Sequence, residues 1–506
     1  MGIKNRLNFP LLGLTKDKLS AASGLGTLME LFDQSPLKHD FLSCLPVRNS
    51  PRSAGSYFLA LATMASFIYG HECLDDIDMF RQDPALKSLF EDKEMAARTI
   101  GDFLRDFDVE HLLKLNQFLN KMSRYIMGLY QAHLPAEYKP QDLIIDIDST
   151  SHVQHGEKME GLAWNYKKEW CLDSQVSFNQ MGLCHGMQLR SGNTKSGVDA
   201  ELLIRQSFDD EKTQVQRKFG LQDYFRGDSA YCKQDVIKTL IELGVQFTLT
   251  AHDGTTGWKE TLRSSGVHWE QWIYTEEEIQ KAEKRKTKLP KIEVTRFHWT
   301  PSWSEKQGSK LVFPIIVKRT WNIKAETAEQ PSLFYADGFE HQDPWDYYAV
   351  VTNFNLDTAT EKLSTTRETS EKNSFPQNKK IKYWNIQEVF LHHQKRGNAE
   401  NFIREEKYNY DLKHFPCQKL LANHAYGLLA MVSHNILRWV AVMMRPAKPH
   451  YAKKLRQRFI FIPGKIIFHA RRIILKMMEC HLKEVHHLRE TLGLTSEKIP
   501  LQFSTA

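Results

Sequence analysis

The stretch from residue 223 to residue 250 constrains the fold most, because it places a strand, a helix and a strand in quick succession. Asp223 to Asp228 is a short run that ends in Arg-Gly-Asp, and helix-forming residues follow from Cys232 to Leu243. Gly244 closes this helix, and Val245 to Thr250 predicts a second strand. Two strands joined in this way run parallel, since a parallel pair needs a helical crossover. The sequence therefore predicts an α/β core with parallel strands.

A second candidate strand lies upstream and also ends in acidic residues. It is the run Leu143-Ile-Ile-Asp-Ile-Asp148. Asp148 and Asp228 thus both stand at the ends of predicted strands, where α/β folds place their sites. Side chains two apart on a strand point the same way, which makes Asp146 an alternative to Asp148. The alternative role for Asp228 is a helix N-cap ahead of Ser229, and the two roles are compatible.

The rest of the chain differs in character from this core. The N-terminal third contains helix-forming stretches such as Ala54 to Tyr69, and Asp83-Pro84 is typical of a helix start. These helices suit a DNA-binding module, and they suit a packing domain equally well. Tryptophans and alternating runs after residue 252 predict a β-rich insertion that is separate from the α/β layer. The expected segments are a helical N-terminal domain (1–135), the first part of the core (136–252), the insertion (253–345), the second part of the core (346–445) and a basic C-terminal region (446–506).

Composition narrows the class of protein. A chain of 506 residues with 25% charged residues is an ordinary globular protein of several domains. The net charge of +7 permits nucleic-acid binding without requiring it. The seven cysteines are scattered without a C-x-x-C pair, which argues against a zinc module and fits a reducing cytoplasm. The most apolar stretch, Leu420 to Leu437, is interrupted by polar residues, and we recognise no signal peptide, so we expect no membrane span.

One predicted helix carries a carboxylate between cations. Two long helices are expected, from Asn385 to Leu412 and from Cys417 to Met444. At about 100° per residue, the first brings His393, Arg396, Glu400 and Lys407 within an arc of roughly 60°. A carboxylate on this stripe can hold a metal ion, while the cations can bind phosphate oxygens. A solvated face with salt bridges between neighbouring turns is the alternative.

These residues resemble a known family. The chain is similar to the DDE transposases of bacterial insertion sequences, in which one helix carries the pattern Y-x2-R-x3-E-x6-K. The spacing is kept at Arg396, Glu400 and Lys407, whereas His393 stands where the family has tyrosine. Further segments resemble the insertion-sequence 1380 lineage of the broader insertion-sequence 4-like group, and together they extend over roughly residues 25 to 480. They are Gly70-His71-Glu72, Asp75-Asp76, Arg81-Gln82-Asp83-Pro84, Asp146-Ile-Asp148-Ser-Thr, His155-Gly156, Trp164-Asn165-Tyr166, Leu189-Arg190-Ser191-Gly192-Asn193 and Arg226-Gly227-Asp228-Ser229.

The resemblance implies an RNase H-like core and a carboxylate site for divalent metal ions. Asp148 would bridge two Mg²⁺ or Mn²⁺ ions, Asp228 would hold one of them and Glu400 the other, as the transfer of a phosphodiester requires. The resemblance assigns His393, Arg396 and Lys407 to DNA phosphates. Because imidazole titrates near neutral pH, the charge of His393 is expected to depend on pH there.

The same resemblance implies an enzyme that cleaves DNA at terminal inverted repeats and joins the ends to target DNA. The expected partners are these two DNAs and a second copy of the chain in the DNA complex, and the expected place is the bacterial cytoplasm, on the nucleoid when DNA is bound. Two alternatives stay open: a transposase-derived DNA-binding protein without catalysis, and a nuclease that lacks strand transfer.

Two groups of residues have both a functional and a structural interpretation. One of the insertion tryptophans, with Trp299, Trp303 and Trp321 as candidates, could stack on a base outside the duplex; most of them are expected to pack in a core. The C-terminal region could follow a phosphate backbone or form a plain solvated surface. Its cations are Arg445, Lys448, Lys453, Lys454, Arg456, Arg458, Lys465, Arg471, Arg472 and Lys476.

Overall fold

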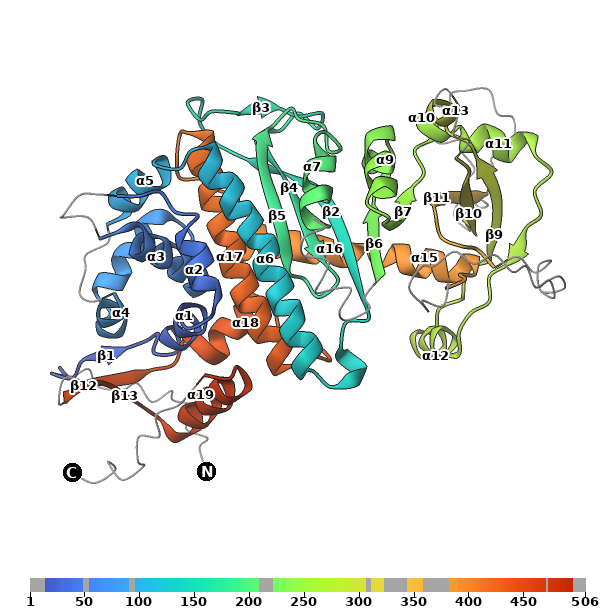
Figure 1. Cartoon of the computed structure of the whole chain (residues 1–506). Coiled ribbons are helices and arrows are strands. Elements are labelled where there is room, and N and C mark those ends of the chain that lie inside the picture. Colours follow the sequence, from blue (N-terminus) through green and yellow to red (C-terminus); the bar gives the residue numbers. More distant parts are fainter. Residues whose placement is uncertain are drawn as a thin grey trace, which may run out of the picture. The chain divides into compact units, whose positions relative to one another are not determined.

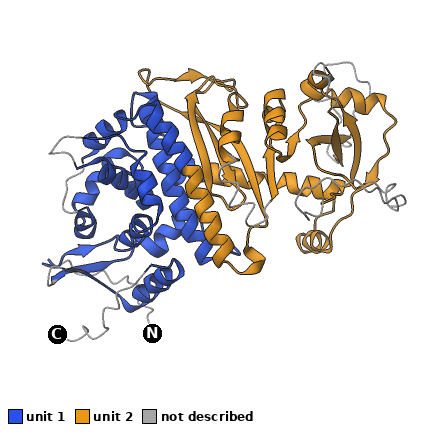
Figure 2. Ribbon diagram, viewed as in Figure 1, with its two compact units in different colours: residues 1–118, 405–506 blue, residues 119–404 orange. Residues whose placement is uncertain are grey.

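The computed structural model describes residues 14–48, 54–90, 96–208, 222–305, 311–322, 344–357, 382–469 and 472–494. The chain divides into two compact units, which Figure 2 shows in different colours. Unit 1 combines residues 1–118 with residues 405–506, and unit 2 contains residues 119–404. Helices α6 (Val109–His133) and α16 (Gly397–Asn409) each run from one range into the other. The N-terminal and C-terminal segments, which were predicted to be separate domains, both contribute to unit 1.

Unit 2 is built on a mixed sheet, whose described strands follow the order β3-β4-β2-β6-β7-β11-β10-β9-β8, with β5 also paired to β4 (Figure 1). Its strands are β2 (Asp142–Val153), β3 (Ala163–Trp164), β4 (Trp170–Asn179), β5 (Cys184–Ser191), β6 (Gln222–Gly227), β7 (Gln246–Thr250), β8 (Glu270–Gln271), β9 (Ile292–Trp299), β10 (Phe313–Trp321) and β11 (Trp345–Thr352).

The centre of this sheet confirms the predicted α/β core. Strand β6, helix α9 (Gln234–Glu242) and strand β7 follow one another, and the two strands pair in parallel with Tyr224 opposite Gln246. Strand β2 pairs in parallel with β6, with Asp146 opposite Arg226. Asp148 and Asp228 both lie just beyond this parallel pairing, but the prediction that the first strand ends at Asp148 is wrong, because β2 continues to Val153.

The prediction that the insertion is separate from the α/β layer is wrong. Strand β11 pairs with core strand β7 on one side and with β10 on the other, both antiparallel. Strands β10, β9 and β8 thus extend the core sheet. A strand edge without a neighbour leaves backbone N–H and C=O groups unpaired, and at β7 strand β11 provides those partners. Alternation in the sequence indicates a strand, but it does not indicate which edge that strand joins. The charged stretch inside the insertion is helix α12 (Glu276–Arg285), which Thr275 caps.

Helix α15 (Ile386–Gln394) packs on the extended part of the sheet. Val389 and Phe390 are fully buried, and they cluster with Ile316, Val350 and Trp272. The other helices of unit 2 are α7 (Ala200–Ser207), α10 (Asp253–Thr256), α11 (Trp258–Ser264) and α13 (Ser302–Glu305).

Unit 1 is organised around helix α17 (Leu420–Met444), which contacts α1, α3, α5 and α19. This helix is long and apolar enough to cross a membrane, but 89% of its apolar window is buried, as expected for a core helix. The surrounding elements are β1 (Leu19–Ser20), α1 (Leu25–Asp33), α2 (Leu37–Leu42), α3 (Ser56–Tyr69), η1 (Leu74–Arg81), α4 (Pro84–Leu89), α5 (Ala97–Arg105), α18 (Ala452–Leu455), η6 (Arg456–Ile460), β12 (Gly464–His469), β13 (Arg472–Met477) and α19 (Glu479–Thr491).

Arg456 joins the two ends of the chain within unit 1. Its guanidinium donates hydrogen bonds to the carbonyl oxygens of Phe67 and Ile68, at the end of α3, and of Asn409. Gly70 caps α3 with φ +98°, and a Cβ there would lie 2.8 Å from the guanidinium. The glycine of the Gly70-His71-Glu72 motif is therefore favoured by its left-handed backbone, and a side chain there would displace the guanidinium of Arg456.

Candidate active site

Asp148 lies near the middle of β2, in the part that continues beyond the pairing with β6. Its side chain is 20% exposed, and its Oδ1 accepts a hydrogen bond of 2.9 Å from the backbone N–H of Ser149. Burial, followed by the nearby carboxylates of Asp228 and Glu400, raises the pKa of Asp148 to about 6 against the lowering effect of Arg396. Asp228 and Glu400 therefore each lie close enough to Asp148 to disfavour its charged form.

Asp146 has a different environment. It is 3% exposed, and Arg226 forms two hydrogen bonds of 2.6 Å with its carboxylate oxygens. The third donor of Arg226 binds the carbonyl oxygen of His392 at 2.8 Å. A carboxylate that is buried and fully paired with a guanidinium has little capacity left for a metal ion. The local geometry thus favours Asp148 over Asp146 as a ligand.

Asp228 follows β6 and caps the short helix η4 (Ser229–Tyr231). Its carboxylate accepts a hydrogen bond of 2.8 Å from the backbone N–H of Ala230, which confirms the N-cap role. Since Asp228 also influences the pKa of Asp148, the capping geometry holds it beside that residue. Its remaining oxygen atom is available for a second role.

Arg396 lies among the carboxylates. One guanidinium nitrogen is 3.3 Å from Asp148 Oδ2, and the other is 3.9 Å from Glu400 Oε1. The Glu400 side chain is 64% exposed, whereas that of Arg396 is 19% exposed. A cation thus partly neutralises the acidic group in this structure.

The prediction of one continuous helix from Asn385 to Leu412 is wrong. Helix α15 ends at Gln394 and α16 begins at Gly397, so Arg396 lies in the turn between them. Glycine is a poor helix former, so interrupting the helix next to Gly397 costs little free energy. The second predicted helix also begins later, at Leu420. His393 and Glu400 therefore do not share a single helical stripe, although the turn still brings Arg396 to Glu400.

His393 is buried, with 1% of its surface exposed. Its Nδ1 lies 3.0 Å from the hydroxyl of Thr248, and its Nε2 lies 2.9 Å from Tyr348 and 3.1 Å from Thr250. Burial, together with Arg396, lowers its pKa to about 3. The expectation that its charge changes near neutral pH is therefore wrong, because desolvation keeps the ring neutral there. In this arrangement the ring holds α15 to strands β7 and β11.

Lys407 is half-buried on the last turns of α16. Seven residues separate it from Glu400, which corresponds to about 10 Å along the helix axis. Unlike Arg396, it belongs to the residue range of unit 1.

The three carboxylates have the chemistry that Mg²⁺ or Mn²⁺ prefers, because their donors are hard oxygen atoms. Among the described residues, no three His, Cys, Asp or Glu side chains lie close enough together to enclose an ion in the present arrangement. The pKa of Asp148 is raised because Arg396 compensates its negative charge only in part. A bound divalent cation would provide the missing positive charge. The residues present thus fit a divalent metal ion, provided that Glu400 and Arg396 rearrange.

The basic C-terminal region contains both structural and exposed cations. Arg456 is internal, Arg458 pairs with Glu484 and Lys465 pairs with Asp17. Arg471 and the side chain of Arg472 lie outside the described residues. The exposed cations Arg445, Lys448, Lys453 and Lys454 lie within residues 445–454, which we call the cationic loop.

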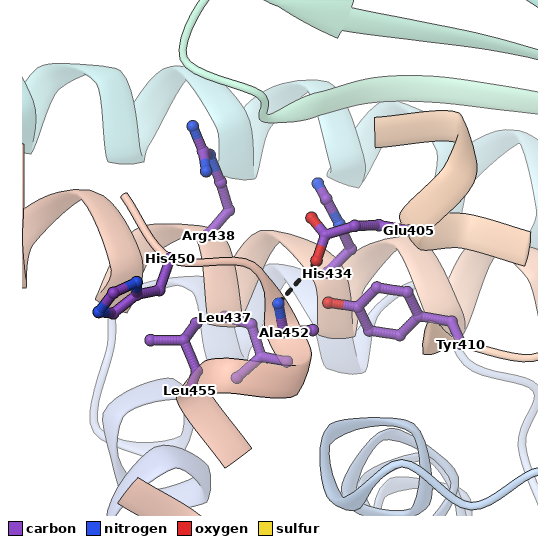
Figure 3. A pocket seen from close by; sticks show the side chains of 8 residues that line it. All are labelled: Glu405, Tyr410, His434, Leu437, Arg438, His450, Ala452 and Leu455. Atoms are coloured by element: carbon purple, nitrogen blue, oxygen red, sulfur yellow. Dashed lines mark hydrogen bonds between the residues drawn. The ribbon is translucent and has the colours of Figure 1, made fainter. Parts of the chain in front are cut away.

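The cationic loop concentrates positive charge. The pKa of His450 is lowered, first by burial and then by four nearby cations: Arg445, Arg458, Lys454 and Lys448. These cations therefore gather around one imidazole ring. The loop is anchored to α16, because the backbone N–H of Ala452 donates a hydrogen bond of 2.7 Å to Glu405 (Figure 3). Glu405 is 5% exposed, and burial raises its pKa to about 7.

The insertion tryptophans occupy different environments. Trp299 is 9% exposed and packs near Phe313, which supports a core role. Trp321 and Trp345 are half-buried and meet edge to face, and Arg319 lies 4.3 Å above the Trp345 ring. The Nζ atom of Lys238 lies 5.1 Å from the centre of the Trp303 ring. Base stacking by one of the three candidates stays a prediction.

The sequence analysis assigned no role to two residues near the site. Arg226 neutralises Asp146, and Tyr348 binds His393 from β11. The proximity of Arg226 to Asp228 in the sequence is a signal for the first, since parallel pairing of β2 and β6 brings it opposite Asp146. No local pattern marks Tyr348, because its contact depends on which strand joins β7.

Carboxylates just beyond a parallel strand pairing, with an arginine among them, have the chemistry to bind divalent ions and a phosphodiester. The family model described as Transposase DDE domain group 1 matches residues 14–308 and 381–494. The chain therefore belongs to this family of DDE transposases, whose members act on DNA and typically use divalent metal ions. No curated protein matches the chain.

Proposed function

We propose that this transposase cleaves DNA at the terminal inverted repeats of its own element and joins the freed ends to target DNA. The observation that carries the proposal is the position of Arg396 between Asp148 and Glu400, with Asp228 near enough to Asp148 to raise its pKa. The family match supports the transposase class. The closer relation to the insertion-sequence 1380 lineage and an RNase H-like topology are part of this proposal.

In this mechanism Asp148, Asp228 and Glu400 would hold two Mg²⁺ or Mn²⁺ ions. When bound, such ions activate the attacking oxygen and stabilise the leaving oxygen. Asp228 stays fixed by its cap to Ala230, whereas the exposed Glu400 can turn toward Asp148. Arg396 then exchanges its carboxylate contacts for the phosphate at the cleaved bond.

Further contacts to DNA come from outside the carboxylate site. Lys407 and the cationic loop supply positive charge for phosphates, and we propose that two copies of the chain act together on two DNA ends. His393 contributes indirectly, since its buried ring orients the helix that leads to Arg396.

The test uses labelled duplexes that carry the inverted repeats flanking the protein's own coding region, incubated with Mg²⁺. The wild-type protein should cut at the repeat and produce joined products, and Asp228→Ala should abolish both while still binding DNA. Cleavage without joined products would instead indicate a nuclease that lacks strand transfer. Binding without cleavage by the wild-type protein would contradict the proposal.

A further inference from the structure

Several motifs that carry the family resemblance lie away from the carboxylates and meet in one place. The segment from His155 to Trp170, which we call the finger, leaves strand β2 and returns as β3 and β4. The indole N–H of Trp170 donates a hydrogen bond of 2.9 Å to the carbonyl oxygen of Gly156. The Gly192 N–H donates one of 3.0 Å to Gly161. The motifs around Gly156, Trp164 and Gly192 thus build a single structure.

The base of the finger leaves no room for a side chain at Gly192. A Cβ there would lie 1.9 Å from the carbonyl oxygen of Cys171 and 2.6 Å from that of Ala163. Backbone atoms cannot yield to such a contact, so a glycine is required where β5 ends against β3 and β4. The base of the finger is therefore packed closely against the end of β5.

Asn165 fixes the tip of the finger. Its Oδ1 accepts hydrogen bonds of 2.9 Å from the backbone N–H groups of Lys167 and Glu169, and its Nδ2 donates one of 2.7 Å to the Glu169 carboxylate. The same carboxylate accepts a hydrogen bond from Ser151 at 2.7 Å. The turn is closed by Lys168 with φ +60°. The acid beside the lysines is thus directed back into the finger, away from its tip.

The tip exposes aromatic rings next to cations. Trp164 is 64% exposed and Tyr166 is 87% exposed, which is unusual for such large rings. Lys167 and Lys168 are exposed beside them, with Lys167 Nζ 5.5 Å from the centre of the Tyr166 ring. A rigid turn that presents two rings and two lysines to solvent is preorganised for a partner that offers flat or sugar surfaces between negative charges.

We propose that the finger contacts the DNA duplex that runs from the carboxylate site, with Trp164 and Tyr166 against sugars and bases and the two lysines against phosphates. This inference rests on the proposed function, since DNA must reach Asp148. Asp148 pairs with Val176 on β4, whose strand begins at Trp170. Strand β4 advances about 20 Å between these positions. At about 3.4 Å per base pair, a duplex that runs along β4 would meet the finger roughly six base pairs from the cleaved bond.

The binding experiment compares Trp164→Ala and Tyr166→Ala with the wild type on a terminal-repeat duplex, by fluorescence anisotropy. Each ring removed should weaken binding roughly tenfold, whereas Trp164→Phe and Tyr166→Phe should lose far less. Tyr383→Ala serves as the control, because Tyr383 is also exposed, at 57%, and follows Lys382. Equal affinity of the wild type and the two alanine variants overturns the proposal.

Shortened duplexes test the position of the contact. On the side that the finger reaches, a duplex of about four base pairs beyond the cleaved bond should be bound equally by the wild type and Trp164→Ala, while a duplex of about ten should separate them. A difference that persists on the short duplex contradicts the assigned position. If the alanine variants bind DNA normally and instead lose the association between two copies in light scattering, the occupant is a second chain and the DNA proposal fails.

The outcomes also separate this inference from the proposed function. Finger variants that bind normally while the wild type cleaves and joins DNA overturn the inference alone. A wild type that binds but never cleaves overturns the proposed function, and the affinities still decide the role of the finger.

Discussion

At the scale of single residues, partners decide the role of each acid. Asp146 and Asp148 occupy one strand, yet Arg226 binds the first and repulsion from Asp228 acts on the second. The sequence indicates that either can face the site, but it does not show which of them is neutralised. That distinction depends on the parallel register between β2 and β6, which places Arg226 opposite Asp146. The N-cap role of Asp228 was easier to predict, since a cap is a local feature.

These two aspartates should respond oppositely to substitution. Asp146→Asn leaves the Arg226 charge buried without its partner, and we expect a loss of about 3–5 kcal/mol in the free energy of unfolding. Asp148→Asn removes a charge that burial and repulsion disfavour, so stability in EDTA at neutral pH should stay equal or rise while cleavage is lost. Denaturation curves and a cleavage assay check both. A destabilised Asp148→Asn with a stable Asp146→Asn would reverse the assignment.

Glu405 predicts a dependence of stability on pH. Its pKa is raised from an ordinary 4.5 to about 7, so the folded state retains a proton that the unfolded chain releases. Stability therefore falls as pH rises from about 4.5 to about 7. Glu405→Gln keeps an acceptor for Ala452 and should be more stable than the wild type by up to roughly 3 kcal/mol at pH 8, with no difference near pH 4. Urea midpoints across pH measure this, and parallel curves for the two proteins would contradict it.

At the scale of elements, periodicity predicted the parallel core but missed two features of arrangement. The segment after residue 385 has helix-forming residues on both sides of Gly397, so the break between α15 and α16 leaves little trace in the sequence. The strands of the insertion were expected, but pairing of β11 with β7 is a contact between distant segments. Strand patterns indicate which residues alternate, and packing decides which strands become neighbours.

The break between the helices gives His393 and Arg396 separate roles. His393→Phe should lower stability, because three hydroxyl partners lose their hydrogen bonds, but it should not change the salt dependence of DNA binding. Arg396→Gln should reduce the slope of log affinity against log salt by about 0.9, the value for one phosphate contact. Anisotropy titrations at several salt concentrations compare them. An equal change of slope in both variants would place the histidine on DNA.

The cationic loop should contribute to the same salt dependence. Replacing Lys448, Lys453 and Lys454 together with glutamine should lower the slope by about 2–3 if each binds a phosphate. Lys87→Gln is the control, since Lys87 is an exposed lysine elsewhere in unit 1. A triple variant that keeps the wild-type slope would make the loop a plain solvated surface.

At the scale of the whole molecule, the two ends of the chain build one unit. Arg456 binds the carbonyl of Ile68 across a separation of 388 residues. No period or local motif in the sequence indicates such a contact, which explains why the ends were expected to form separate domains. The basic character of Arg456 was visible, but its burial was not, and so it was grouped with cations that are exposed.

Gly70→Ala tests this connection. The left-handed backbone alone costs about 1–2 kcal/mol for alanine, and the clash with Arg456 adds to that cost. Gly493→Ala is the matched control, because Gly493 has φ +70° with open space around it. Thermal unfolding should show a larger loss for Gly70→Ala. Equal losses would mean that Arg456 moves aside freely.

The discontinuous composition of unit 1 has a consequence for the newly synthesised protein. Residues 1–118 leave the ribosome well before residue 405, and 286 residues, counted from 119 to 404, intervene. At about 5–20 residues per second, this delay lasts roughly 15–60 s. During that time the apolar surface of α3 lacks helix α17, its later neighbour in the core. We therefore expect the yield of this transposase in a cell to depend on chaperones that bind exposed apolar helices of the nascent chain.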